Sequence, residues 1–149
     1  MQKQAKLITS LFYLGHSPLM PGTVGSLAGL LIYSLVKDNA VLYGFSTLFI
    51  FVLGMVFSGE AEKIYKHKDA KAIVIDEACG MLLALAFLPY RLALVIIGFI
   101  LFRFFDIIKP PPAKKIEELA GAWGIMIDDI LAAIYTNLIL QILFRLLRL

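Results

Sequence analysis

Five apolar stretches alternate with short polar segments along the chain, and each is predicted to be a helix. They cover residues 24–36, 40–57, 78–88, 92–105 and 130–147. The second holds 18 consecutive residues without a charge and is the clearest membrane-spanning candidate. The first and third are short, so they either re-enter the membrane or begin inside the polar motifs that precede them. Helix is expected throughout, because backbone groups in lipid need internal hydrogen bonds.

Polar and proline-rich segments mark where these helices end. Short polar turns lie at residues 37–39 and 89–91. Residues 110–112 are three consecutive prolines, which stop the fourth stretch because proline lacks the N–H group and clashes with the preceding turn. Residues 113–120 are polar and helix-prone. Residues 121–124 are expected to form a turn in which Trp123 anchors the chain at the membrane interface.

The composition indicates that this helical chain lies in lipid. Of its 149 residues, 60% are hydrophobic and 17% are charged, and the mean hydropathy is +0.87. A soluble domain of this length has too little interior to bury so much apolar surface. The sequence therefore predicts an all-α fold, a compact multi-helix integral membrane protein with four to five hydrophobic helices. Residues 1–149 are expected to form one membrane-embedded domain.

Charge and cysteine content bear on other classes of protein. The net charge of +3 and the pI near 9.0 fit basic loops beside a membrane, and no interleaving of basic and aromatic residues indicates nucleic-acid binding. Cys79 is the single cysteine, so an intrachain disulfide and a Cys-based metal cluster are both excluded. The basic start and apolar residues 7–14 resemble a weak signal peptide. No clear small-residue cleavage site follows, so we expect the N-terminus to stay in the mature protein.

Basic residues gather on one side of the predicted spans. Those on that side are Lys3, Lys6, Lys63, Lys66, Lys68, Lys71, Lys109, Lys114 and Lys115. The opposite connections hold Lys37 and Arg91. The positive-inside rule therefore places the N-terminus, residues 58–76 and residues 106–124 in the cytoplasm. Arg145 and Arg148 would lie outside if the last stretch spans, so that helix is expected either to lie along the surface or to end inside.

Five acidic residues sit at the edges of the apolar stretches, near the predicted cytoplasmic side. They are Asp76, Glu77, Asp106, Asp128 and Asp129. A charged side chain at the centre of a membrane helix costs roughly 2.5–3.5 kcal/mol, so five such acids need a reason. Carboxylates gathered at one depth make a site for a hard cation such as Mg²⁺, which keeps several of its waters. The alternative is that the acids pair with Arg103, Lys71 and Lys109 and hold the helices together.

A segment rich in glycine, proline and hydroxyl groups, residues 15–26, precedes the first apolar stretch. Glycine lets backbone N–H groups approach an anion, and a helix start favours negative charge, so the segment is a candidate phosphate cradle. The residues of this cradle are Gly22, Thr23, Gly25 and Ser26. The alternative is an ordinary helix start capped by Thr23 or Ser26. His16 is a candidate base, although a lone loop histidine is more often incidental.

Two cations at the end of the fourth stretch each have two interpretations. Arg103 and Asp106 are three residues apart and can pair, or Arg103 can face a phosphate with its planar fork. Lys109 lies just before the prolines. It is either a solvated cation at a helix C-terminus or a point charge that binds phosphate.

Four segments, in this order, resemble the phosphatidylglycerophosphatase A family. They are residues 21–27 (PGTVGSL), 75–77 with 80–81 (IDE and GM), 102–110 (FRFFDIIKP) and 124–129 (GIMIDD). Each motif alone is modest, but all four in order are specific. The resemblance implies a bacterial inner-membrane, multi-pass enzyme of phospholipid biosynthesis. Such an enzyme would use Mg²⁺ to hydrolyse a membrane phospholipid, phosphatidylglycerophosphate, to phosphatidylglycerol and phosphate.

For this chemistry we predict three overlapping sets of site residues. Magnesium is assigned to Asp76, Glu77, Asp106 and Asp129. Phosphate is assigned to Gly22, Thr23, Gly25, Ser26, Arg103 and Lys109. The catalytic set is Asp76, Glu77, Asp106, Lys109, Asp128 and Asp129. The sequence leaves open whether a carboxylate off the metal acts as general base or forms an aspartyl-phosphate. It also leaves the oligomeric state open.

Two rival functions predict other features. A phosphotransferase for lipid-linked phosphoalcohols would carry a long, regular Asp/Gly/Ala-Arg signature on one helix, and the sequence has none. A non-enzymatic, ion-coupled membrane transporter predicts acids near the bilayer midplane and an internal repeat. The acids here lie at the edges of the stretches, and no repeat is visible in the sequence.

Overall fold

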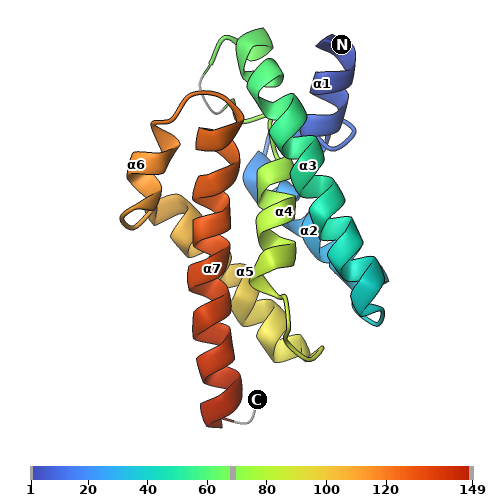
Figure 1. The fold of residues 1–149 in the computed structure, drawn as a ribbon, viewed down its shortest axis with the longest axis vertical. Coiled ribbons are helices and arrows are strands. Elements are labelled where there is room, and N and C mark those ends of the chain that lie inside the picture. Colours follow the sequence, from blue (N-terminus) through green and yellow to red (C-terminus); the bar gives the residue numbers. More distant parts are fainter. Residues whose placement is uncertain (1, 68–69, 148–149) are drawn as a thin grey trace.

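The computed structural model describes residues 2–67 and 70–147, and in that part of the chain every regular element is a helix (Figure 1). The elements are α1 (Gln2–Thr9), the 3-10 turn η1 (Leu14–His16), α2 (Pro21–Val36), α3 (Ala40–Tyr65), α4 (Ile75–Ala84), α5 (Leu92–Ile108), α6 (Ala113–Glu117) and α7 (Ala122–Leu147). The helices α2, α3, α4, α5 and α7 overlap the five apolar stretches, so the all-α prediction is confirmed, although α3 continues to Tyr65, α4 ends at Ala84 and α7 starts at Ala122. Lys68 and Arg148, used in the topology prediction, lie outside the described residues.

Two of these helices, α3 and α7, are long and apolar enough to cross a membrane. The candidate spans are Ala40–Tyr65, with 26 residues, and Ala122–Leu146, with 25. A hydrocarbon core needs about 20 residues. Only 11% of the most apolar part of α3 and 33% of that of α7 are buried inside the protein. The outward side chains of α3 include Phe45 and Val56, both mostly exposed, which fits lipid as their surroundings.

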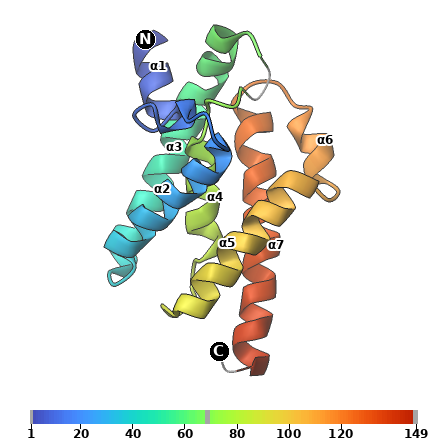
Figure 2. The same ribbon diagram turned by 180° about the vertical axis from the view of Figure 1, so that it is seen from behind.

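The short helix α4 lies in the middle of the assembly (Figure 1, Figure 2). It contacts α2, α3, α5 and α7, and eight of its ten residues are buried. Both α2 and α4 start inside the preceding polar motif, at Pro21 and Ile75, which confirms one of the two predicted alternatives. Ten residues are too few to span a bilayer. Instead, α4 carries the acids of its first turn, Asp76 and Glu77, into the interior.

Glycines let the neighbouring helices approach α4 closely. A Cβ atom at Gly25 of α2 would lie 2.8 Å from the carbonyl oxygen of Val74. A Cβ atom at Gly80 of α4 would lie 2.6 Å from Cζ of the fully buried Phe102 of α5. Small residues at such crossings allow helix backbones in membranes to pack tightly. The contacts therefore bring the start of α2 and the end of α5 to the first turn of α4.

The predicted turn at residues 121–124 is wrong except at Gly121. The helix α7 begins at Ala122, so Trp123 lies in its first turn, with its side chain exposed. Gly121 makes the break with a φ of 68°, a conformation that glycine adopts readily. Its N–H donates to Oε2 of Glu62 over 3.0 Å. The helix extends beyond the apolar stretch because its first turns pack against α6 and α3, and such contacts override local sequence preference.

Candidate active site

Three carboxylates from two helices converge beside the first turn of α4. One oxygen atom from each of Asp76, Glu77 and Asp129 lies within 4.8 Å of the other two, and these residues are called the acid trio below. Asp76 and Glu77 come from the first turn of α4, and Asp129 comes from α7. Asp76 is 5% exposed and Asp129 is 3% exposed, so water screens their charges little.

The acid trio fits a hard cation in both donor type and number. Among the described residues, Oε2 of Glu77 and Oδ2 of Asp129 are buried and have no hydrogen-bond partner. A buried carboxylate oxygen without a partner costs free energy, which a bound cation would offset. Mg²⁺ prefers oxygen ligands and is held by a few carboxylates while it keeps several waters.

The charges around the trio also favour a cation. Burial, together with the charge of Asp129, raises the pKa of Glu77 well above its usual range. The negative charges of three further carboxylates also repel that of Asp129, and these carboxylates belong to Asp106, Asp76 and Asp128. A divalent cation among these groups would reverse the repulsion and stabilise the ionised carboxylates.

Asp106 is paired with a cation at the edge of the trio. Its Oδ2 accepts a hydrogen bond from Nη1 of Arg103 over 2.6 Å, and both side chains are mostly buried. Nη1 of Arg103 also lies 3.5 Å from Oγ of Ser26. The internal ion pair predicted from the three-residue spacing is therefore present. The charge of Asp106 also repels those of Asp129 and Glu77, although its closest contact is with the guanidinium of Arg103.

Lys109 joins the end of α5 to α7 and α6. Its Nζ lies 2.6 Å from Oδ2 of Asp128 and 2.9 Å from Oε1 of Glu117. Asp128 is 4% exposed, so its charge is held in the interior by this lysine. The interpretation of Lys109 as a solvated helix-end cation is wrong, because its side chain is only 17% exposed.

A polar cavity of about 710 Å³ lies beside the trio. Its charged lining residues are Lys71, Glu77, Arg103, Asp106 and Lys109. A Cβ atom at Gly22 would lie 2.5 Å from Oε1 of Glu77 and 2.9 Å from Nη2 of Arg103. The missing side chain at residue 22 thus leaves room for both charged groups. Cations and carboxylates around one cavity suit a phosphate that binds against a metal ion.

The predicted phosphate cradle is a helix start rather than a loop. Met20, with a φ of 46°, precedes α2 as its N-cap and makes no side-chain capping bond, so capping by Thr23 or Ser26 is wrong. The N–H of Thr23 donates to the carbonyl oxygen of Met20, and Oγ of Ser26 donates to that of Gly22. Gly22 lines the polar cavity, whereas Gly25 packs against α4.

Two lining residues were missed or undervalued in the sequence. The sequence indicates Lys71 as an ion-pair partner or a cytoplasmic loop cation, and His16 as a candidate base that is more often incidental; in the structure both line the polar cavity. Nε2 of His16 also lies 3.3 Å from Oη of Tyr65. The chain segments that hold His16 and Lys71 contact each other at Gly15, where a Cβ atom would lie 2.2 Å from the carbonyl oxygen of Ala72. The one sequence signal for this contact is the glycine itself.

Comparison with known proteins identifies relatives of similar length. The chain is 32% identical over 144 residues to a Bacteroides thetaiotaomicron protein provisionally named phosphatidylinositol-3-phosphatase, covering 91% of both chains. It is 37% identical to the phosphatidylglycerophosphatase A of Haemophilus influenzae, covering 80% of this chain and 76% of the relative. It is 35% identical to that of Escherichia coli, covering 80% and 72%. No solved structure matches the chain.

The relatives agree on the class of enzyme, since all three are named as phosphatases, and the prediction of a phosphoric monoester hydrolase is confirmed. The sequence model described as Phosphatidylglycerophosphatase A matches residues 7–144, which contain every residue of the acid trio and of the charged cavity lining. With this match and with relatives above 30% identity over most of their length, the chain belongs to the phosphatidylglycerophosphatase A family.

Proposed function

We propose that the protein hydrolyses phosphatidylglycerophosphate to phosphatidylglycerol and inorganic phosphate, as a step of phospholipid biosynthesis. The observation that carries this proposal is the polar cavity, in which Arg103 and Lys109 lie beside the acid trio. The cavity offers positive charge for a terminal phosphate and oxygen ligands for a metal ion. The two relatives named phosphatidylglycerophosphatase A support the substrate.

The acid trio would hold a magnesium ion. When bound there, magnesium supplies positive charge that polarises the phosphoryl group. Asp106 belonged to the metal set predicted from sequence, but its ion pair with Arg103 makes it a neighbour of the metal site in this proposal. The buried oxygens of Glu77 and Asp129 support the assignment, because they have no hydrogen-bond partner among the described residues.

The chain's own residues would orient and stabilise the reacting phosphate. The guanidinium of Arg103 can hold two phosphate oxygens at once, and Lys109 adds a point charge at the cavity wall. Positive groups fixed before the reaction stabilise the charge that develops on the non-bridging oxygens. Water adds across the terminal P–O ester bond, and a carboxylate that does not bind the ion accepts the proton of the attacking water.

The site is proposed to face the cytoplasm in a multi-pass inner-membrane protein. The start of α2, the start of α4 and the end of α5 meet at the polar cavity. The lysine-rich connections lie at this end of the helices, whereas the opposite ends carry fewer basic residues, Lys37 after α2, Arg91 before α5 and Arg145 in the last turn of α7. This distribution supports the cytoplasmic side by the positive-inside rule.

The names of the relatives define the experiment. The purified full-length protein should release phosphate from phosphatidylglycerophosphate in mixed micelles, with magnesium, faster than from phosphatidylinositol 3-phosphate. If the protein releases phosphate faster from phosphatidylinositol 3-phosphate, the proposed substrate is wrong, but the protein is still a lipid phosphatase. Absence of phosphate release from both lipids would overturn the function. Membership of a phosphatase family argues against the phosphotransferase and transporter alternatives.

A further inference from the structure

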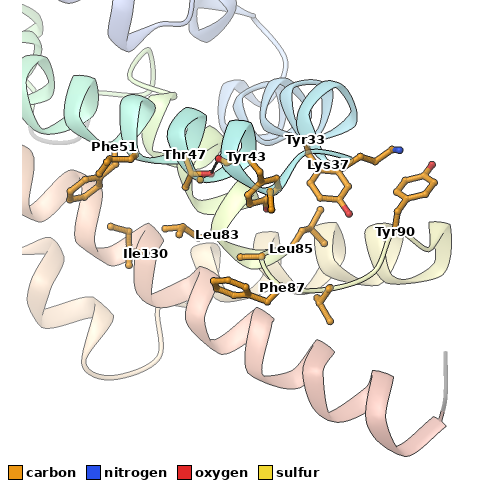
Figure 3. A pocket seen from close by; sticks show the side chains of 15 residues that line it. Tyr33, Lys37, Tyr43, Thr47, Phe51, Leu83, Leu85, Phe87, Tyr90 and Ile130 are labelled. Carbon is orange, nitrogen blue, oxygen red and sulfur yellow. Dashed lines mark hydrogen bonds between the residues drawn. The ribbon is translucent and has the colours of Figure 1, made fainter.

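A second cavity, of about 600 Å³, lies toward the other end of the helices (Figure 3). Its lining comes from the end of α2, the start of α3, residues 83–90 and Ile130 of α7. Within the described part of the chain, no residue lines both this cavity and the polar cavity. Along α2, the nearest lining residue of this cavity, Tyr33, follows Gly22 by 11 residues, or roughly 16 Å at 1.5 Å per helical residue, and Lys37 lies farther still.

The second cavity is an elongated groove with one polar end. One face of α3 lines it with Ala40, Tyr43, Gly44, Thr47, Leu48 and Phe51. These residues cover roughly 16 Å of helix. Figure 3 places Lys37 and Tyr90 at one end of the groove and Phe51 and Ile130 at the other. Its volume lies within the range of about 300–1,000 Å³ that is usual for small-molecule sites.

The polar end offers a cation, Lys37, whose acidic partner is exposed to solvent. Nζ of Lys37 lies 4.4 Å from the ring centroid of Tyr90, and it donates to Oδ1 and Oδ2 of Asp38 over 2.9 and 2.8 Å. The Asp38 side chain is 84% exposed, and exposed ion pairs contribute little free energy, so a phosphate can compete for Lys37. Tyr33 packs against Tyr90 beside it. Lysine and tyrosine together are typical of the membrane–water interface.

The wall opposite α3 is held in place by a side chain of α7. Nδ2 of Asn137 donates to the carbonyl oxygens of Ala84 and Ala86 over 3.0 and 2.8 Å, which satisfies backbone groups at the end of α4. The next residue, Phe87, has a φ of 61°, which is uncommon for an aromatic residue, and it is 97% exposed. So exposed a ring beside an apolar groove fits contact with lipid better than contact with water.

We propose that this groove binds one acyl chain of a bilayer phospholipid, with the lipid phosphate at Lys37. The groove lies between α3 and α7, the two candidate membrane spans, so acyl chains are the apolar molecules that surround it. A long apolar trough with a cation at one end matches a chain attached to an anionic headgroup. Because Lys37 follows the end of α2 that points away from the polar cavity, the lipid headgroup belongs to the leaflet opposite the active site. This inference needs the membrane location of α3 and α7 and does not depend on the enzyme's substrate.

Gly44 offers a way to fill the groove without disturbing the fold. A Cβ atom there meets nothing within 4 Å, so Gly44→Leu should occupy the groove and leave the neighbouring helices in place. The full-length protein is reconstituted in nanodiscs of equal phosphatidylglycerol and phosphatidylcholine, extracted in mild detergent, and analysed by native mass spectrometry for retained lipid. Wild type should retain one phospholipid per chain, with phosphatidylglycerol favoured. Gly44→Leu should lower this retention by about tenfold, or about 1.4 kcal/mol, because the leucine side chain would take the space of the acyl chain.

Three further variants control the test. Gly44→Ala removes the glycine without filling the groove, and Val56→Phe adds bulk to an exposed face of α3 that does not line it, so both should retain lipid like wild type. Lys37→Gln should lower the preference for phosphatidylglycerol by about fivefold, since one basic residue near a membrane contributes about 1 kcal/mol. This rim variant keeps the test decisive if Gly44→Leu lowers stability.

Four results would overturn the proposal. They are a wild type without retained lipid, equal retention in wild type and Gly44→Leu, an equal loss in Val56→Phe, and an unchanged lipid preference in Lys37→Gln. A wild-type dimer that Gly44→Leu converts to a monomer, without any change in lipid retention, would instead identify a second copy of the chain as the occupant.

Discussion

Nζ of Lys109 lies 2.6 Å from Oδ2 of Asp128, so the residue that ends α5 neutralises an acid buried in α7. Removal of one partner from such a pair leaves the other charge uncompensated in the interior. We expect Lys109→Met to lower the free energy of unfolding by about 3–5 kcal/mol, measured by thermal or chemical unfolding in detergent.

A matched set of variants separates this effect from a general loss of lysine. Lys114→Met, at an exposed position of α6, should leave stability near that of wild type. The double variant Lys109→Met with Asp128→Asn should recover much of the lost stability, because it removes both charges. Unfolding of Lys109→Met at the wild-type temperature would contradict the assignment of this pair.

The acid trio should respond in the opposite way to the loss of one charge. Asp76→Asn and Asp129→Asn each remove one of several crowded negative charges, so the metal-free protein should be as stable as wild type or more stable. Phosphate release should fall by roughly 10²–10³-fold, the usual effect of removing a charge-stabilising group. Asp106→Asn provides the contrast, because it breaks the ion pair with Arg103 and should lower both stability and activity. Wild-type turnover in the Asp76 and Asp129 variants would defeat the site assignment.

Gly22 and Gly44 form a matched pair for alanine substitution. The Cβ atom of Gly22→Ala would meet the flexible ends of Glu77 and Arg103 at 2.5 and 2.9 Å, so both charged groups must move while the backbone can stay. We expect phosphatase activity to fall by about tenfold or more with little change in stability, since small displacements in an active site are costly. Gly44→Ala, in open space, should keep full activity. Equal activity in the two variants would mean that Gly22 does not border the reacting groups.

The helices of this protein could be predicted from the sequence because the signals are local. Charge-free runs, three consecutive prolines and short polar turns set the ends of most of the helices. The pairing of Arg103 with Asp106 was also predictable, because residues three apart share one helix face. The start of α7 was not predictable, because Trp123 joins that helix through contacts with other elements rather than through its neighbours in sequence.

The division of the five acids into different roles needed the structure. Asp128 and Asp129 are neighbours in the sequence, but successive residues of a helix point about 100° apart, and the two acids have different partners. Asp128 meets Lys109 across the gap between two helices, whereas Asp129 joins the trio. Which of the two acids faces the first turn of α4 depends on the rotation of α7 about its own axis, and helix packing sets that rotation. The apolar groove was hidden for the same reason, since ordinary apolar residues of several elements line it.

The topology can be tested by labelling introduced cysteines from either side of the membrane. The natural Cys79 is fully buried and should not react, so it can remain. A membrane-impermeant thiol reagent added to intact cells should label Asp38→Cys, at the exposed connection after α2, and should label Lys114→Cys only after lysis. The reverse pattern would place the polar cavity outside the cytoplasm and contradict the proposed orientation.

The last prediction separates metal binding from catalysis. If the acid trio holds magnesium, the folded protein binds the ion and the unfolded chain does not, so magnesium must stabilise the fold. At an ion concentration 100 times the dissociation constant the gain is about 2.7 kcal/mol, which thermal unfolding in detergent would register as a higher Tm. Asp129→Asn should lose most of this gain, because it removes a ligand from the trio. Asp38→Asn, which removes an exposed carboxylate at the far end of α2, should keep the stabilisation by magnesium.

Activity should vanish with a chelator and return with added magnesium in wild type. A Tm that magnesium leaves unchanged in wild type, or raises equally in Asp129→Asn, would rule out the trio as the metal site even if the enzyme needed magnesium for turnover, since the ion would then enter with the substrate phosphate.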